Sequence, residues 1–444
     1  MRVILSGAGA MGVYLMLILL PLLLGSVFRP PSTSFLVNLS AGLAYVGFAI
    51  LALELALVSH VNRAASAFGL DVLQQFHKEI GIAAFCLVAS HPILLVVAGY
   101  PARVLLLHSR VPWSVALGTL AFLALALLIG LSIGRKRLRL PYGVWQVSHG
   151  LLTVAMIAMA GIHIVTVGRY GRGTPMDAVR ASYLLLLLCL YANYRLVLPL
   201  RLMRKPWRVV ENHEEAGDSR TLRLAPDGHR GWPRGFEAGQ FAWLHVGRSP
   251  LSYDHHPISL SSSGDAAAES GEIAFTVKRL GDWSGQVVPN VRAGDRVWVD
   301  GPYGVFTLDR VQGPGYVFLA GGVGITPLRS MLVTMAERED VRPVVLLYGV
   351  RLAADLTFGE ELKALEARMN LTFVPVVAEP SPDWAGERGY ITADLLRKYL
   401  PPRQYRRWQY FICGPGRMMD AMEEMLPGMG VPPEQIHTER FDMV

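Results

Sequence analysis

Hydrophobic and polar residues are arranged in two different ways along the chain. The first two hundred positions contain long apolar runs, and the remainder alternates short apolar and polar stretches. Each long run can cross about 30 Å of hydrocarbon as a helix. The runs lie near residues 11–28, 35–60, 77–99, 113–134, 145–167 and 181–200. The pattern therefore predicts a six-helix transmembrane bundle over residues 1–204, followed by a soluble part.

The soluble part changes its own pattern near residue 312. Between 205 and 312, runs such as TLRLAP and IAFTVKRL are separated by Gly, Pro and Asp turns, which predicts an antiparallel β-barrel. From 313 to 444, strands such as YVFLAGG alternate with helical stretches, which predicts an α/β parallel sheet of the nucleotide-binding type. The predicted fold class is thus a multi-domain membrane protein with three domains.

Composition indicates a membrane protein, and the distribution of charge indicates its orientation in the membrane. Hydrophobic residues make up 52% of the chain, and the net charge is +7. The basic residues gather in GRKRLRLPYG, after the fourth run, and in RLVLPLRLMRKPWR, at the end of the sixth. Lys and Arg mark the cytoplasmic side of membrane proteins, so we interpret the charge as orientation and expect no nucleic acid partner. Arginines in the loops at 100–112 and 168–180 weaken this contrast without reversing it.

Six crossings with this charge pattern predict a cytoplasmic N-terminus and a cytoplasmic soluble part, with the bundle in the lipid bilayer of the cell inner membrane. The first run could be a signal peptide, but LLLGSVFRP offers no A-x-A-like cleavage site, which favours a retained helix. Cys86, Cys189 and Cys413 are far apart in the sequence. Their spacing indicates neither a disulfide framework nor a zinc or iron–sulfur site.

Two of the predicted helices carry a histidine at each end of an apolar segment. HKEIGIAAFCLVASH runs from His77 to His91, and HGLLTVAMIAMAGIH runs from His149 to His163. Fourteen helical residues separate the members of each pair by about 21 Å and keep them on nearly one face. Since both helices run outward, His77 and His149 should share the inner level, and His91 and His163 the outer level. Facing imidazoles at two depths are the metal ligands that two bis-histidine haem b groups need.

Other roles for these histidines remain open. A single histidine in a membrane helix can be a hydrogen-bonded core residue or part of a proton relay. The repeated spacing on two parallel helices favours haem ligation, because ionisable groups inside the membrane are costly and rare. Glu54, within the second run, can serve a proton pathway, a hydrogen bond on the haem side or helix pairing. Phe85 can bridge the two haems or simply pack.

The stretch LAGGVGITP is the most informative motif of the soluble part. Gly321, Gly322 and Gly324 leave backbone N–H groups open to a pyrophosphate. Thr326 can cap the helix that follows, and Pro327 suits its first turn. A glycine cluster can also be an ordinary tight turn, but its position after a strand and before a helix favours a dinucleotide site.

Five motifs occur in the order found in ferredoxin–NADP reductase-like modules. They are HPISLSS (256–262), LGDWS (280–284), GPYG (301–304), GGVGITP (321–327) and CGP (413–415). Joined to helices with paired histidines, the whole chain resembles the ferric reductase and NADPH oxidase superfamily, of the bacterial type. The resemblance covers nearly all of the chain, and the ordered set is more specific than any one motif.

The resemblance implies roles for most residues of these motifs. One set would contact the flavin ring of FAD: His256, Pro257, Ile258 and Ser259. A second set would hold the pyrophosphate region of FAD: Gly281, Asp282, Trp283 and Ser284. A third set would take the nicotinamide dinucleotide: Gly321, Gly322, Gly324 and Thr326. Cys413, Gly414 and Pro415 end a strand at the expected place for the nicotinamide. Phe441 resembles the aromatic residue that covers the flavin until nicotinamide displaces it.

These parts imply a transmembrane oxidoreductase. NAD(P)H would reduce FAD in the cytoplasm, and the electrons would pass through two haem b groups to an acceptor across the membrane. Arg351 can meet a 2′-phosphate and so favours NADPH over NADH, although it can equally be a solvated loop arginine. The expected acceptor is a ferric chelate or molecular oxygen. The alternative is an electron-transfer subunit that serves quinone or a periplasmic partner protein.

Overall fold

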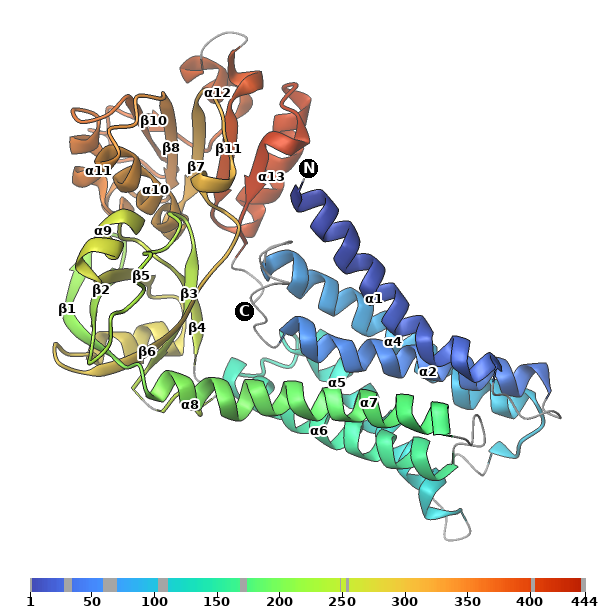
Figure 1. The fold of residues 1–444 in the computed structure, drawn as a ribbon. Helices are drawn as coiled ribbons and strands as arrows, with labels where there is room; N and C mark the ends of the chain where they lie inside the picture. The colour runs from blue at the N-terminus through green and yellow to red at the C-terminus, as the bar shows by residue number, and fades with distance from the viewer. Residues whose placement is uncertain are drawn as a thin grey trace. The chain divides into compact units, whose positions relative to one another are not determined.

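The computed structural model describes residues 2–27, 34–58, 70–102, 111–167, 174–247, 249–252, 255–400 and 404–440. The chain forms two compact units, Met1–Leu198 and Pro199–Val444. The first unit is helical, and the second contains two β-sheets (Figure 1).

The first unit is a bundle of long helices that pack side by side (Figure 1). They are α1 (Arg2–Val27), α2 (Phe35–Val58), α4 (Leu70–Val97), α5 (Trp113–Gly134), α6 (Tyr142–Val167) and α7 (Thr174–Ala192). A π-helical turn (Asn193–Val197) joins α7 to α8 (Leu198–Met203). Five stretches of the described residues are long and apolar enough to cross a membrane: Phe35–Glu54, Val72–Val97, Trp113–Gly134, Tyr142–Val167 and Asp177–Met203. The apolar stretch of α1 is the shorter Met11–Val27, so a sixth crossing remains a prediction.

Small residues allow the helices of the bundle to approach one another closely. Ala49 and Ala52 on α2 and Ala84 on α4 are almost completely buried. A Cβ atom on Gly47 would lie 2.8 Å from Val88 Cγ2 and 3.0 Å from the Ala84 carbonyl oxygen. Only glycine therefore permits this approach of α2 to α4. Such close packing matters because lipid provides no hydrophobic driving force between helices.

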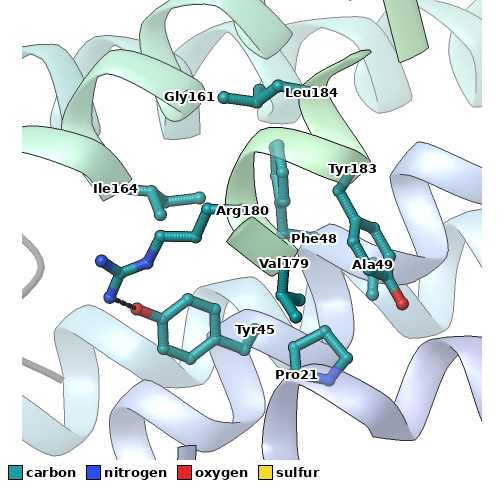
Figure 2. A pocket seen from close by; sticks show the side chains of 10 residues that line it. All are labelled: Pro21, Tyr45, Phe48, Ala49, Gly161, Ile164, Val179, Arg180, Tyr183 and Leu184. Atoms are coloured by element: carbon teal, nitrogen blue, oxygen red, sulfur yellow. Dashed lines mark hydrogen bonds between the residues drawn. The ribbon is translucent and has the colours of Figure 1, made fainter. Parts of the chain in front are cut away.

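A pocket lies between α1, α2, α6 and α7 (Figure 2). Arg180 is the only charged residue among the described residues that line it, and its Nη2 donates to the Tyr45 hydroxyl at 2.8 Å. Its Nη1 donates to Asp177 at 3.0 Å, so the buried guanidinium has its counter-ion one helical turn away. Arg180, which the sequence pattern assigned to a loop, thus lies within α7 and ties that helix to α2.

The second unit begins with an antiparallel sheet. As far as the chain is described, its strands are β1 (Trp207–Glu215), β2 (Ser219–Pro226), β3 (Phe241–Val246), β4 (His256–Ser259), β5 (Ile273–Lys278) and β6 (Arg296–Tyr303). They are ordered β4-β3-β6-β1-β2-β5, which confirms the predicted antiparallel sheet. Leu260, just beyond β4, forms an isolated bridge to Phe275 of β5 at the other edge. Closure into a full barrel remains a prediction.

A parallel sheet follows, as the strand and helix alternation predicted. Its strands are β7 (Tyr316–Gly321), β8 (Val344–Val350), β9 (Leu371–Val377), β10 (Glu387–Arg388), β11 (Gln409–Cys413) and β12 (Ile436–Thr438). The order β10-β9-β8-β7-β11-β12 reverses direction between β7 and β11. Ligands of open α/β sheets bind at the carboxyl ends of strands at such a point. The ends of β7 and β11 are therefore the expected nucleotide site.

Helices cover both faces of the parallel sheet. Apolar side chains of α10 (Ile325–Glu337) and α11 (Gly359–Leu365) pack on one face, and those of α12 (Ala393–Tyr399) and α13 (Gly416–Gly428) pack on the other. Coverage of both faces explains why β7 is an uninterrupted buried apolar run.

Side chains of α10 join the two sheets of the second unit. Arg338, just after α10, donates to both oxygens of Asp265 on α9 (Gly264–Ser270), at 2.6 and 2.9 Å, and to Asp309 at 2.7 Å. These hydrogen bonds hold the pKa of Asp265 below its usual value. The hydroxyl of Ser330 donates to the Ser262 carbonyl at 2.7 Å. The segment after β4 is thereby fixed against the helix that follows the glycine-rich turn.

Candidate functional site

In the first unit, α4 and α6 bring His77 and His149 face to face. Their ring centroids lie 6.4 Å apart, with 66° between the ring planes. Two imidazoles that each bind one metal ion through a ring nitrogen, at about 2 Å, have centroids roughly 6 Å apart. The separation thus fits two histidines that bind one iron. The inner pair predicted from the fourteen-residue spacing is brought together.

His91 and His163, the second predicted pair, lie near the other ends of α4 and α6. Gly118 on α5 makes room for the His163 ring, because a Cβ atom at Gly118 would lie 2.6 Å from His163 Nδ1. The place of His163 therefore depends on a glycine in a helix that carries none of the four histidines.

Each of the four histidines has its Nδ1 atom in a hydrogen bond to a residue of a neighbouring helix, either α2 or α5. The partners are Glu54 Oε2 for His77, Ser40 Oγ for His91 (2.7 Å), Ser132 Oγ for His149 (3.3 Å) and the Ser114 carbonyl oxygen for His163 (2.8 Å). Histidine ligands commonly donate one ring N–H to such a partner, which fixes the tautomer and turns the other nitrogen towards the metal. The arrangement therefore leaves Nε2 of all four rings for iron.

The surrounding hydrogen bonds decide which nitrogen carries the proton. The Ser114 carbonyl can only accept, so His163 Nδ1 must donate. Ser132 gives its single hydroxyl proton to the Leu128 carbonyl at 2.8 Å, and its oxygen accepts from Trp145 Nε1 at 3.2 Å. Ser132 can then only accept from His149. The chemistry of these donors and acceptors fits bis-histidine haem ligation.

A haem site of this kind needs only two protein ligands. The described residues contain no group of three or more His, Cys, Asp or Glu side chains that could hold a bare metal ion. Phe85, between His77 and His91 on α4, stacks on Phe122 of α5 with ring centroids 5.7 Å apart and planes at 8°. Phe85 therefore packs, and a bridging role remains a prediction.

Sequence reasoning missed Ser40, Ser114, Ser132 and Gly118. None of them stands out from the small residues that membrane helices commonly contain. Their positions on or beside α2 and α5 become meaningful only once the histidines of α4 and α6 lie against them. For Glu54, the contact with His77 favours the hydrogen-bond role among the three left open.

In the second unit, the structure brings together two of the motifs that imply FAD. The ring of His256, on β4, stacks on Trp283 with centroids 4.2 Å apart and planes at 29°. Trp283 Nε1 is buried and has no hydrogen-bond partner among the described residues, which suits a donor that awaits a ligand. Ser259 is buried, whereas Pro257 and Ile258 are partly exposed on the same strand. These residues fit one edge of a flavin site.

The loop 281–284 is wound tightly by its own serine. Ser284 Oγ accepts from the backbone N–H groups of Leu280 and Gly281 at 2.9 and 3.0 Å. It also donates to the Gly281 carbonyl at 3.2 Å. Asp282 then leads into the π-helical turn Trp283–Val287. The serine hydroxyl thus shapes the loop, and the indole is the side chain that the loop presents.

The two glycine motifs of the parallel sheet lie against each other at the ends of β7 and β11. A Cβ atom on Gly324 would lie 2.2 Å from the Cys413 carbonyl oxygen, and one on Gly414 would lie 3.0 Å from Gly321 Cα. A Cβ atom on Gly321 would meet Pro415 Cδ at 2.7 Å. Glycine is therefore required for close approach of the loops as well as for access to a pyrophosphate.

Two details of this motif differ from the sequence prediction. Thr326 does not cap α10, because the helix begins at Ile325 and the Thr326 hydroxyl donates to the Val323 carbonyl at 2.8 Å. The chain instead enters the helix through a 3₁₀ turn (Gly322–Gly324), in which Gly322 adopts a φ of 51°. The left-handed conformation at Gly322 explains the second glycine of the motif.

Arg351 follows β8 and is exposed, with Nη1 3.8 Å from Glu379 Oε2. Cys413, at the end of β11, is almost completely buried. Phe441 lies outside the described residues. The sequence analysis missed two further polar residues at this end of the unit, Lys278 and Glu439. Lys278 Nζ lies 4.0 Å from the place that a Cβ atom on Gly322 would occupy. Glu439 is buried, and its Oε1 lies 3.2 Å from the place that a Cβ atom on Gly304 would occupy.

Comparison with known proteins agrees with both units. Residues 43–160 match the family model of the ferric reductase like transmembrane component, and residues 318–424 match that of the oxidoreductase NAD-binding domain. Ferredoxin–NADP reductase B of Sorangium cellulosum is 30% identical over 213 residues, which are 47% of this chain and 86% of that protein. This chain belongs to the ferric reductase-like proteins that carry a ferredoxin–NADP reductase-type module. Its first part is thus similar to the transmembrane component of ferric reductases, and its second part is similar to ferredoxin–NADP reductase-type modules.

Two further likenesses describe how far the similarity extends. The reductase component of propane 2-monooxygenase from Rhodococcus jostii is 31% identical over 242 residues, and this chain covers 62% of its length. A solved structure of flavohemoglobin from Malassezia yamatoensis, with bound FAD and heme, has a TM-score of 0.50 and 17% identity, with 91% of this chain and 96% of that chain covered. At that identity the likeness concerns the fold alone.

Proposed function

We propose that the reductase passes electrons from cytoplasmic NAD(P)H through FAD and two haem b groups to an acceptor on the opposite side of the membrane. The acceptor is a ferric chelate or molecular oxygen. Two observations support the proposal: the rings of His77 and His149 face each other, and each of the four membrane histidines has its Nδ1 atom in a hydrogen bond. A bundle that only anchored the flavin reductase would have no need for four imidazoles oriented in this way.

Within domain 1–204, His77 and His149 would hold the inner haem, and His91 and His163 the outer haem. Bound there, the two groups supply one-electron carriers at two depths of the membrane. The residues around them fix each ring, so that Nε2 rather than Nδ1 faces the iron. Because two histidines would hold each group, the acceptor would be reduced without binding to the metal.

Within domain 205–312, His256–Ser259 and Gly281–Ser284 would bind FAD, which supplies the exchange between hydride and single-electron transfer. The stacked His256 and Trp283 rings and the buried indole N–H support this assignment. Within domain 313–444, Gly321, Gly322, Gly324 and Thr326 would hold the dinucleotide. Cys413, Gly414 and Pro415 would flank the nicotinamide, and Phe441 would cover the flavin before nicotinamide arrives.

The orientation is supported by the basic turn after α5. The Arg135 guanidinium lies 5.4 Å from the Tyr142 ring centroid and 5.2 Å from that of Trp145. Aromatic rings gather at membrane boundaries, and Lys and Arg mark the cytoplasmic one. Trp145 lies one turn before His149, so the His77–His149 pair would be the cytoplasmic pair. The N-terminus and the flavin reductase unit would then lie in the cytoplasm, with the six helices in the cell inner membrane.

Arg351 supports NADPH as the electron donor. Its pairing with Glu379 is long and both side chains are about two-thirds exposed, at 67% and 63%. Such a pair contributes little, so a 2′-phosphate can replace the carboxylate at small cost. We therefore propose NADPH in preference to NADH.

Anaerobic reduction of the purified, haem-loaded protein tests the function. NADPH should reduce the haem absorption bands, and NADH should do so more slowly. Air-saturated buffer or a ferric chelate is then added, and haem reoxidation is followed. Fast reoxidation by air with superoxide identifies an oxidase, and fast reoxidation by chelate alone identifies a ferric reductase. Reoxidation only by a soluble quinone would support the electron-transfer alternative, and a haem spectrum that never responds to NADPH would refute the pathway.

A further inference from the structure

The four proposed haem ligands differ in the charge of the group that accepts their Nδ1 proton. His77 donates to the carboxylate of Glu54. The other three meet neutral oxygens, which belong to Ser40, Ser114 and Ser132. The inner pair thus has one anionic partner, and the outer pair has none within the described residues.

Glu54 is placed to act on His77 as a hydrogen-bond acceptor. It is 4% exposed, on the side of α2 that faces the other helices. Glu54 Oε2 accepts a hydrogen bond from His77 Nδ1, and Glu54 Oε1 accepts one from the Tyr14 hydroxyl at 3.4 Å. An ionised carboxylate can only accept, so one donor on each oxygen suits that form. In the part of the chain that the structure describes, no Lys or Arg pairs with Glu54, so a negative charge on Glu54 would act on His77 without a competing cation.

A carboxylate and a neutral oxygen have different effects on a metal through histidine. When Nδ1–H donates to a carboxylate, the imidazole becomes a more basic ligand. A more basic ligand and a nearby negative charge both stabilise ferric iron relative to ferrous iron, which lowers the reduction potential. Charges in a dry helix bundle are weakly screened, so the second effect is larger here than at a protein surface.

We propose that Glu54 is a positioning residue that sets the reduction potential of the inner haem below that of the outer haem. The difference would favour electron transfer in the outward direction. The proposal rests on the proposed haem ligation, and it concerns the order of the two potentials rather than the presence of haem. Glu54 would act on the iron through His77, whose Nδ1 atom it contacts.

The test is a redox titration of the full-length, haem-loaded protein, followed by haem absorbance. Wild type should show two separate one-electron steps. Glu54→Gln keeps the shape and a carbonyl oxygen that accepts from Nδ1 but removes the charge. We expect this variant to keep two haems per chain. The reduction potential of the lower step should rise by about 59 mV, which is about a tenfold change in the equilibrium constant of a one-electron reduction. The higher step should not move.

Two variants separate charge from shape. Ser40→Ala removes the neutral partner of His91 and should shift only the higher step, by less. Glu54→Asp keeps the charge and should keep most of the low potential, which also provides a readout if Glu54→Gln loses haem. Unchanged potentials in a two-haem Glu54→Gln protein, equal shifts of both steps, or an Asp variant that behaves like Gln would overturn the proposal. A wild-type protein without haem would overturn the proposed function as well.

Discussion

The flavin reductase unit and the membrane unit assemble their candidate sites in opposite ways. In the reductase unit the site residues lie in short contiguous motifs at the ends of strands, as in 281–284 and 413–415. In the membrane unit each histidine and its hydrogen-bond partner lie on different helices, far apart in sequence. Loops can therefore encode a site locally, whereas a helix bundle must combine single residues from several helices.

Glycine serves both units, but for different neighbours. At the ends of β7 and β11, Gly324 makes room for the backbone of a neighbouring strand. In the bundle, Gly118 makes room for a side chain, the ring of His163. A backbone cannot move aside, whereas a ring can rotate, so the same substitution should cost more in the reductase unit.

The largest expected effect is a change in the haem content of the membrane unit that leaves the reductase unit active. Replacing both His77 and His149 by Ala should reduce the haem content from two to one per chain, because both axial ligands of the inner site are lost. FAD content and NADPH-dependent reduction of a soluble dye should remain, since those depend on the other unit. Haem is measured by its alkaline pyridine spectrum, and flavin by fluorescence.

Ser148→Ala is the matched control for the histidine variant. Ser148 precedes His149, and its hydroxyl donates to the Trp145 carbonyl at 2.9 Å within α6. The control should keep both haems. An unchanged haem content in the double histidine variant would contradict the proposed pairing.

Gly324→Ala should damage the reductase unit next most strongly. The added Cβ atom would lie 2.2 Å from the Cys413 carbonyl oxygen, and the two loops would have to separate. We expect a loss of about 1–3 kcal/mol in the free energy of unfolding and slower flavin reduction by NADPH. Stopped-flow absorbance measures the rate, with the haem content as an internal reference. Gly428→Ala, where no atom lies within 4 Å, should change neither, and equal behaviour of the two variants would argue against the close approach.

Gly118→Ala should have the smallest effect of the three. The Cβ atom would lie 2.6 Å from His163 Nδ1 and would push the ring from the Ser114 carbonyl. We expect a cost of about 1 kcal/mol and weaker retention of one haem, with the other unaffected. Haem release to apomyoglobin measures retention. Gly130→Ala on the same helix is the control, because the added Cβ atom would have no neighbouring atom of the described residues within 4 Å. This variant should release haem at the wild-type rate. Identical release kinetics in the two variants would contradict the role of Gly118.

Much of the fold follows from local patterns. Apolar runs of about twenty residues predict membrane helices wherever they occur, and β7 and β8 are recognisable as continuous apolar strands. The capping role of Thr326 was wrong because a 3₁₀ turn moved the start of α10 forward. Arg180 was assigned to a loop because the sixth apolar run begins at residue 181, and its hydrogen bond to Tyr45 joins two helices that are far apart in the sequence.

Local patterns along the chain are enough to predict the order of the parts, the two histidine levels and the contiguous reductase motifs. These features depend on residues that are near one another along the chain or on the fixed rise and turn of a helix. By contrast, the packing of the helices is what brings Ser40, Ser114 and Ser132 to histidines on other helices, and Glu54 to His77. Helices that are apolar on all sides give no periodic signal for which face meets which neighbour, so these contacts emerge only when the bundle is packed.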